Sequence, residues 1–353
     1  MQKLLKTIFS PFFDENFFEN EEFEKKLLEV KNLLPKHILT VITKIFAEST
    51  KGKLNFEETA CRFQKQLKKC NLPKNISKVI PLEMHSLEYT NKLIRQKIQE
   101  LSKILPYFRS IRGDGNCFYR AVGLAFLEQI FYKFWVSYRE GKLKTSELID
   151  FLTVLEQRKF PLIKCTLSET SNSKSYRILE EFLRDQEILL YVFLRQCCKL
   201  IMILVQSEDF REVIAALEKA FLENHLFDMS LVIVMRSILH FTLMNNLKRE
   251  EYVPFMVSPD EFLRSLQIFG EEAENILIPI SADALKRVIV IHMVHKDQGT
   301  GVPIILTEKY EPLIMNEGKE KDNLPVINLY FRPGHYDLGY EKEKNDLLKY
   351  FQN

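Results

Sequence analysis

The feature that most constrains the fold is a change in residue pattern after Pro279. Before it, apolar residues mostly recur at spacings of three and four, the period of an amphipathic helix. After it come short runs at 287–294 and 302–307 that are rich in β-branched residues, and a third stretch at 324–340 that completes a set of short strands with turns between them. Helices followed by a cluster of short strands are typical of α+β folds. We therefore predict a small, mostly antiparallel sheet covered by helices.

The first 80 residues have a character of their own. Acidic clusters alternate with Phe and Leu at helical spacing over residues 12–38, and Pro73 interrupts a helical pattern between polar neighbours. We expect a helical N-terminal extension over residues 1–80. Its apolar stripe has two interpretations at this point: packing onto the rest of the chain, or binding a partner.

Composition excludes several classes of protein. With 50 basic and 48 acidic residues, the formal charge is +2, so no polyanion-binding signature is present and no nucleic-acid partner is expected. The most apolar run, residues 188–205, contains Arg195, Gln196 and Lys199 near its middle, which favours a buried helix over a membrane span.

The cysteines and the first residues bear on the cellular compartment. Six cysteines show no C-x-x-C spacing, so we expect neither a disulfide framework nor a zinc site. The first 13 residues lack a secretory pattern. These features predict a cytoplasmic protein with reduced thiols, with the nucleus left open as a second location.

One of these cysteines stands where a nucleophile would. The stretch RGDGNCFYRAVGLAF, residues 112–126, places Cys117 between a Gly-containing turn and the start of a predicted helix. Backbone amides and the helix dipole at that position favour a thiolate and are able to bind an oxyanion. Gly115 permits a special backbone conformation. We expect the amides of Gly115, Asn116 and Cys117 to form the oxyanion site.

Asp114, three residues before the cysteine, has two compatible interpretations. It stabilises the turn, as Asp before Gly often does, and it orients the loop that carries the oxyanion amides.

A thiol nucleophile needs a base, and His335 is the best candidate among the seven histidines. It follows Arg-Pro-Gly, which breaks a strand, and it opens the run HYDLGY. In an extended strand His335 and Asp337 share one face and Tyr336 takes the other. Asp337 then orients one imidazole nitrogen while the other nitrogen faces Cys117, as in a cysteine–histidine–carboxylate triad. His292 and His295, three apart, fall on opposite faces of a strand and make a poor pair.

These two motifs resemble those of the otubains, a branch of the ovarian-tumour (OTU) family of deubiquitinating cysteine proteases. RGDGNCFYRA is similar to their nucleophile motif and YFRPGHYDLGY to their histidine motif, in the same order along the chain. Weaker similarity extends the resemblance over residues 81–341, which we expect to be the catalytic domain, followed by a tail at 342–353. The resemblance implies a papain-like α+β fold.

The same resemblance implies the chemistry. Cys117 would be the nucleophile, His335 the base, Asp337 its orienter and Asp114 the support of the oxyanion loop. Ubiquitin or polyubiquitin would be the substrate, ubiquitin-conjugating enzymes are further candidate partners, and neither a metal nor an organic cofactor is implied.

Two departures from the family pattern bear on this prediction. The segment at about 205–260 is longer than usual and helical by pattern, so we expect a helical insertion there. Gly339 stands where a larger apolar residue is expected. Two alternatives to a deubiquitinase stay open: an otubain-like scaffold that binds ubiquitin or a conjugating enzyme with little turnover, and a protease for a ubiquitin-like modifier.

Overall fold

The computed structural model describes residues 35–36, 38–41, 56–70, 72–143, 146–157, 159, 161–167, 174–246, 258–294, 304–313 and 324–341. The tail expected at 342–353 and most of the helical pattern at 12–38 lie outside these described residues. The described part of the expected N-terminal extension includes helix α4 (Phe56–Lys68). Phe63 and Leu67 of this helix are buried in the main core, so this part of the extension packs onto the rest of the chain.

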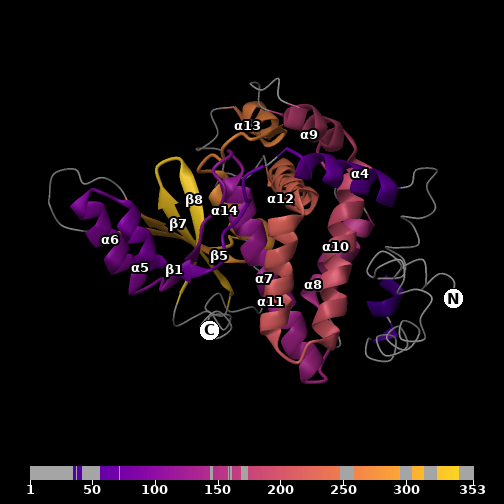
Figure 1. Cartoon of the computed structure of the whole chain (residues 1–353), viewed down its shortest axis with the longest axis horizontal. Helices are drawn as coiled ribbons and strands as arrows, with labels where there is room; N and C mark the ends of the chain where they lie inside the picture. The colour runs from indigo at the N-terminus through magenta and orange to yellow at the C-terminus, as the bar shows by residue number, and fades with distance from the viewer. Residues whose placement is uncertain are drawn as a thin grey trace.

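A six-stranded sheet lies to the left of the long helices in Figure 1. Its strand order is β1-β2-β8-β7-β5-β6, and every neighbouring pair is antiparallel except β5 and β7. The prediction of a mostly antiparallel sheet is thus confirmed. The strands are β1 (Ile80–Pro81), β2 (Tyr107–Arg109), β5 (Val288–Met293), β6 (Leu306–Tyr310), β7 (Val326–Arg332) and β8 (His335–Tyr340).

Two of these strands come from the helical part of the chain, which the residue pattern did not predict. β1 has two residues and β2 three, too few for a period of two to be visible in the sequence. A second, parallel pair joins β3 (Thr166–Leu167) to β4 (Ile268–Phe269).

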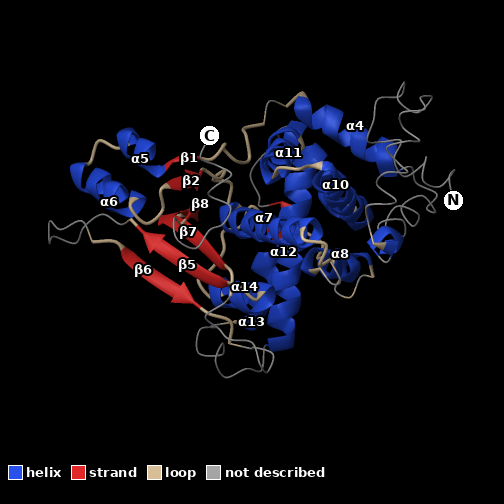
Figure 2. Cartoon of the chain, turned by 90° about the horizontal axis from the view of Figure 1, so that it is seen from below, coloured by secondary structure: helices blue, strands red, loops and turns tan. Residues whose placement is uncertain are grey.

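Helices cover both faces of the main sheet (Figure 2). A short arm packs on one face and contributes Leu82, Ile98 and Leu101 to a small core with Phe108 and Tyr330. This arm consists of α5 (Leu82–His85), the 3₁₀ turn η3 (Ser86–Glu88) and α6 (Lys92–Ser102). The larger helical body lies on the other side and holds the main core. Its helices are α4, α7 (Cys117–Arg139), α8 (Glu147–Glu156), α9 (Lys174–Arg184), α10 (Gln186–Gln206), α11 (Phe210–Glu223), α12 (His225–Asn246), α13 (Pro259–Leu266) and α14 (Leu277–Leu285).

Helices α7 and α12 cross at the centre of this body. At Gly123 of α7 an added Cβ would lie 2.8 Å from Met235 Cγ and 3.1 Å from the Leu231 side chain, so a glycine is needed for this close approach. α12 falls within the segment expected to form a helical insertion, yet every side chain from Leu226 to Leu239 is buried. It is therefore part of the core that supports α7.

Two helices, α10 and α12, are long and apolar enough to cross a membrane by length and composition. However, 67% and 83% of their most apolar windows are buried inside the protein. Both helices therefore have the environment of core helices, as predicted for the run at 188–205.

A tight hairpin joins β7 to β8 and positions the histidine motif. Arg332 pairs with His335 across it, and Gly334 has a φ of 75°, in the left-handed region that favours glycine. At Gly339 an added Cβ would lie 2.6 Å from Leu105 Cδ1, so Leu105 takes the space of the larger side chain expected at this position. Tyr340 follows, buried, and donates to Glu128 of α7 at 3.0 Å.

Candidate active site

The turn before Cys117 is built on a glycine that no other residue can replace. Gly115 has a φ of +73°, and an added Cβ would lie 1.7 Å from the Gly270 carbonyl oxygen. The Asp114 carboxylate accepts a hydrogen bond from the Asn116 amide at 3.1 Å. This bond is the contact expected of an aspartate that stabilises the turn.

Cys117 is the first residue of α7 and is 5% exposed. The Asn116 side chain makes no capping hydrogen bond to the helix, which is unusual for an asparagine at this position. Its carbonyl oxygen instead accepts from Arg236 Nη2 at 2.9 Å and from the Gly270 amide at 3.1 Å. The positive end of the α7 dipole is thus left at the thiol without a side-chain cap.

One amide of the predicted oxyanion site already has a hydrogen-bond acceptor. The Asn116 amide, expected to be one of three oxyanion donors, already donates to Asp114 within the turn. The amides of Gly115 and Cys117 are the remaining candidates from the predicted set.

The strand β8 brings His335 and Asp337 to the cysteine. His335 Nε2 lies 2.9 Å from Asp337 Oδ1, and the imidazole is close enough to Cys117 for the thiol to raise its pKa. Tyr336 points to the opposite face and packs on the ring of Phe118, with 5.3 Å between ring centroids. The predicted alternation along this strand is therefore confirmed, and the three side chains of the predicted triad meet.

Electrostatics favour a protonated imidazole at this site. Burial opposes the positive charge, but the hydrogen bonds to Asp337 and Cys117 and the negative charge of these groups raise the pKa of His335 to about 9. Gly113 lies against the ring, since a Cβ there would be 3.3 Å from His335 Nδ1. The ring thus has a fixed place between the cysteine loop and Asp337.

Asp337 has no exposed surface and its carboxylate accepts three hydrogen bonds. The donors are the Ile111 amide at 2.8 Å, His335 at 2.9 Å and Arg332 Nη2 at 2.7 Å. Burial by itself would raise the pKa of Asp337, but the bond from His335 and the charge of Arg332 outweigh it and lower the pKa. The carboxylate therefore remains ionised at neutral pH.

A buried network of ion pairs connects the cysteine loop to helices α7 and α12. Arg120 of α7, 1% exposed, donates to Asp114 with two nitrogens at 2.9 Å each and to Asp228 of α12 at 2.7 and 3.0 Å. Burial would raise the pKa of Asp114, but the charge of Arg120 outweighs it and lowers the pKa. Asp114 is thus fixed to the body of the protein as an anion.

A second residue of α12 holds the other half of the loop. Arg236 is fully buried, binds Asn116 and lies over the ring of Tyr119, with 3.9 Å from its Cζ to the ring centroid. Asp228 and Arg236 are eight residues apart, so they share one face of the helix. Sequence reasoning missed both residues, although two charges in the apolar run 226–239 were a signal for buried polar contacts.

The expected N-terminal extension also reaches the cysteine loop. The Arg112 amide donates to the Asn75 carbonyl at 2.9 Å, and Ile76 forms an isolated β-bridge with Ile111. Ile111 and Arg112, just before Asp114, are thus anchored by residues that precede the domain boundary predicted near residue 80.

The other described histidines have partners elsewhere. His292 is buried in β5 and lies 3.0 Å from Asn328 Oδ1, while His225 lies 3.1 Å from the Asn75 side chain. His85 contacts Tyr89 and Glu88, and His240 contacts Gln267. His37 and His295 lie outside the described residues.

A thiol at a helix N-terminus, beside an imidazole that is hydrogen-bonded to a buried carboxylate, is the arrangement found in cysteine hydrolases. Comparison with known families makes the class more specific, because the model for the family described as Peptidase C65 Otubain matches residues 68–341. The chain therefore belongs to the otubain family. This match begins before the boundary near residue 80 that the sequence suggested.

The sequence identity to individual relatives is low. The chain is 24% identical over 276 residues to the ovarian tumor domain-containing deubiquitinating enzyme 1 of Arabidopsis thaliana, covering 74% of this chain and 79% of that protein. It is 26% identical over 270 residues to human ubiquitin thioesterase OTUB1, covering 75% and 83%. A solved complex described as h/ceOTUB1–ubiquitin aldehyde–UBC13~Ub contains a chain that matches with a TM-score of 0.48 and 20% identity, covering 82% of this chain and 100% of that one.

Proposed function

We propose that this protein is a deubiquitinase, a thiol isopeptidase that cleaves ubiquitin from lysine amines or from polyubiquitin. The observation that carries the proposal is that Cys117 lies beside His335, which is hydrogen-bonded to Asp337, inside a domain of the otubain family. Relatives named as a deubiquitinating enzyme and a ubiquitin thioesterase support ubiquitin as the modifier.

In the proposed reaction the Cys117 sulfur attacks the carbonyl carbon of the isopeptide bond after its proton passes to His335. The oxyanion accepts hydrogen bonds from the amides of Gly115 and Cys117. As the tetrahedral intermediate collapses, the imidazolium of His335 gives its proton to the leaving lysine amine and a thioester remains. Neutral His335 then takes a proton from water, which hydrolyses the thioester and restores the thiol.

Asp337 and Asp114 have supporting roles in this proposal. Asp337 keeps Nε2 of His335 occupied, so that the other ring nitrogen faces the thiol. Asp114 keeps the oxyanion turn in place through the Asn116 amide and Arg120. Ubiquitin-conjugating enzymes are proposed as further partners, and the cytoplasm is the proposed location, consistent with six free thiols.

The direct test uses ubiquitin that carries a cysteine-reactive electrophile at its C-terminus. We expect the wild-type protein to form a covalent adduct, Cys117→Ala to form none and His335→Ala to react slowly. Cys61→Ser is the matched control, because Cys61 lies exposed on α4, and it should react like the wild type. If the wild-type protein binds ubiquitin but forms no adduct, the scaffold interpretation replaces the enzyme. If the protein reacts with a probe built on a ubiquitin-like modifier and not with the ubiquitin probe, that modifier is the substrate.

A further inference from the structure

Among the described residues, the Asp337 carboxylate accepts hydrogen bonds from the Ile111 amide, from His335 and from the guanidinium of Arg332. Arg332 ends β7 and stands opposite His335 across the hairpin. Its Nη2 donates to Asp337 Oδ2 at 2.7 Å, whereas Oδ1 serves His335 and the Ile111 amide. Arg332 therefore fixes the second oxygen of the carboxylate, and with it the plane of the group that orients the imidazole.

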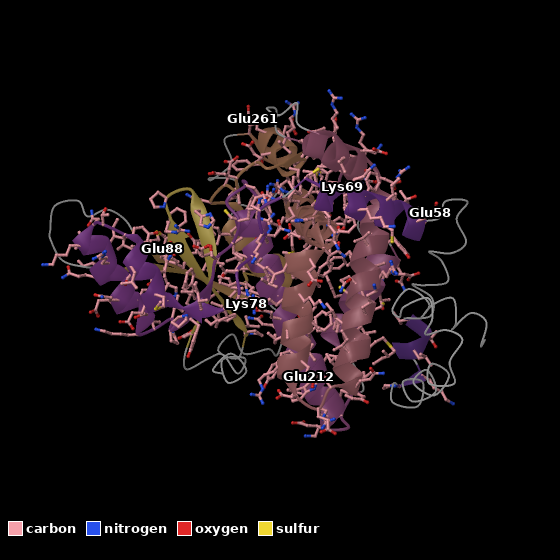
Figure 3. The ribbon with its side chains drawn as sticks, in the orientation of Figure 1. Glu58, Lys69, Lys78, Glu88, Glu212 and Glu261 are labelled. Atoms are coloured by element: carbon pink, nitrogen blue, oxygen red, sulfur yellow. The ribbon has the colours of Figure 1, made fainter. Side chains whose placement is uncertain are left out.

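Arg332 is itself held by the arm on the far side of the sheet. Its Nη1 donates to the Tyr89 hydroxyl at 3.1 Å, and its Cζ lies 5.8 Å from the ring centroid of Tyr330. The Tyr89 hydroxyl also lies 3.2 Å from His85 Nε2, and His85 Nδ1 lies 3.0 Å from Glu88. Glu88 is exposed on the arm, away from the long helices (Figure 3).

We propose that Arg332 and Tyr89 are positioning residues for the reaction at Cys117: Arg332 locks the Asp337 carboxylate, and Tyr89 locks Arg332. This inference rests on the proposed thiol chemistry of Cys117. A carboxylate held at both oxygens cannot rotate, so it keeps the imidazole aligned while the proton moves between sulfur, nitrogen and leaving group.

The positive charge of Arg332 adds an electrostatic effect that can be tested. It is among the groups that lower the pKa of Asp337. The charged and titratable groups around this pair are His335 beside Asp337, Tyr89 and Tyr330 beside Arg332, and His85 and Glu88 behind Tyr89. Replacing Arg332 by a neutral residue removes a cation from Asp337, so the carboxylate should take up a proton at higher pH.

The experiment compares Arg332→Met, Arg332→Lys and Tyr89→Phe in turnover of ubiquitin bearing a C-terminal fluorogenic amide, as a function of pH. For Arg332→Met we expect kcat to fall on the order of 10²-fold with KM unchanged, and the acid limb of the kcat profile to move to higher pH. Arg332→Lys should keep the wild-type acid limb and regain part of kcat, because the charge remains. Tyr89→Phe should lower kcat without moving the acid limb.

The matched control is Arg184→Met, which breaks an exposed ion pair with Glu180 and should match the wild type in both respects. Two results for Arg332→Met would overturn the proposal. One is a kcat profile whose acid limb lies at the same pH as in the wild type. The other is a change in KM with kcat unchanged. Should Arg332→Met fail to fold, Tyr89→Phe decides, because wild-type kcat in this variant contradicts a positioning role.

A second measurement separates this proposal from the proposed function. Alkylation of Cys117 by iodoacetamide, followed by mass spectrometry across the same pH range, requires no ubiquitin. The exposed Cys61 in the same sample is the reference thiol. If the wild-type protein fails to turn over ubiquitin, the acid limb of Cys117 alkylation must still move in Arg332→Met and stay in Arg332→Lys. An unchanged limb in both variants rejects the positioning role whatever the modifier.

Discussion

Replacing Asp228 by asparagine tests whether α12 holds the catalytic loop through a buried charge. Asp228 is 1% exposed and accepts two hydrogen bonds from Arg120, at 2.7 and 3.0 Å. Asparagine has nearly the same size, but it carries no charge and keeps only one acceptor oxygen. The substitution therefore removes charge and one hydrogen bond and creates no cavity.

The expected cost follows from what remains around Arg120. Breaking a buried ion pair typically costs about 3–5 kcal/mol, because the other charge is left without compensation. Here Asp114 still neutralises Arg120 through two bonds of 2.9 Å, so the lower end applies. We expect Asp228→Asn to lower the free energy of unfolding by about 3 kcal/mol, measured by urea denaturation.

Glu180→Gln is the control, since it also turns a carboxylate bonded to an arginine into an amide. That pair is exposed on α9, so its loss should cost only about 0.3–0.5 kcal/mol. In ubiquitin-probe labelling under folding conditions, Asp228→Asn should react on the order of tenfold more slowly, because Arg120 holds Asp114 less firmly. Equal unfolding costs for the two variants would refute the claim that Asp228 compensates a buried charge.

Three further predictions concern the loop and the histidine. Gly115→Ala should abolish probe labelling, because the new Cβ displaces the Gly270 carbonyl. The left-handed φ alone should lower the free energy of unfolding in urea by about 1–2 kcal/mol. Labelling at the wild-type rate would show that the turn relaxes freely. Cys117→Ala should lower the pKa of His335 from about 9, since the thiol helps to raise it. NMR titration of the imidazole would detect this change. An unchanged pKa would mean that the two side chains do not interact. Because the pKa of His335 is raised on folding, the stability that it contributes is present below its unfolded value of 6.5 and is lost as the pH rises through about 9. Urea unfolding over this range should show the decline, and His335→Gln should remove that part of it.

The parts of the site that sequence reasoning predicted are those specified by neighbouring residues. Cys117 stands at a turn–helix junction defined by Gly115, and His335 and Asp337 share a face because a strand alternates. Each of these placements needs only a few consecutive residues. The α+β class was predictable for the same reason, since β5 and β7 contain β-branched residues and β8 follows directly after the turn at Pro333 and Gly334.

The supporting residues needed contacts between distant parts of the chain. Asp228 is 108 residues from Arg120, and Arg236 is 120 residues from Asn116. A single sequence shows that such charges are costly inside an apolar helix, but it does not show which partner compensates them. The short strands β1 and β2 were missed for the same reason, because they exist only through pairing with each other and with β8.

The two arginine networks explain why the site needs this much of the chain. A thiol and an imidazole react only when the loop that carries Cys117 and the strand that carries His335 keep their relative position. Arg120 ties that loop to α12 through Asp228, while Arg332 ties the β7–β8 hairpin to the α5–α6 arm through Tyr89. The two halves of the site are thus fixed to opposite sides of the sheet. Loss of either anchor should therefore reduce reactivity without removing any atom that touches the substrate carbonyl.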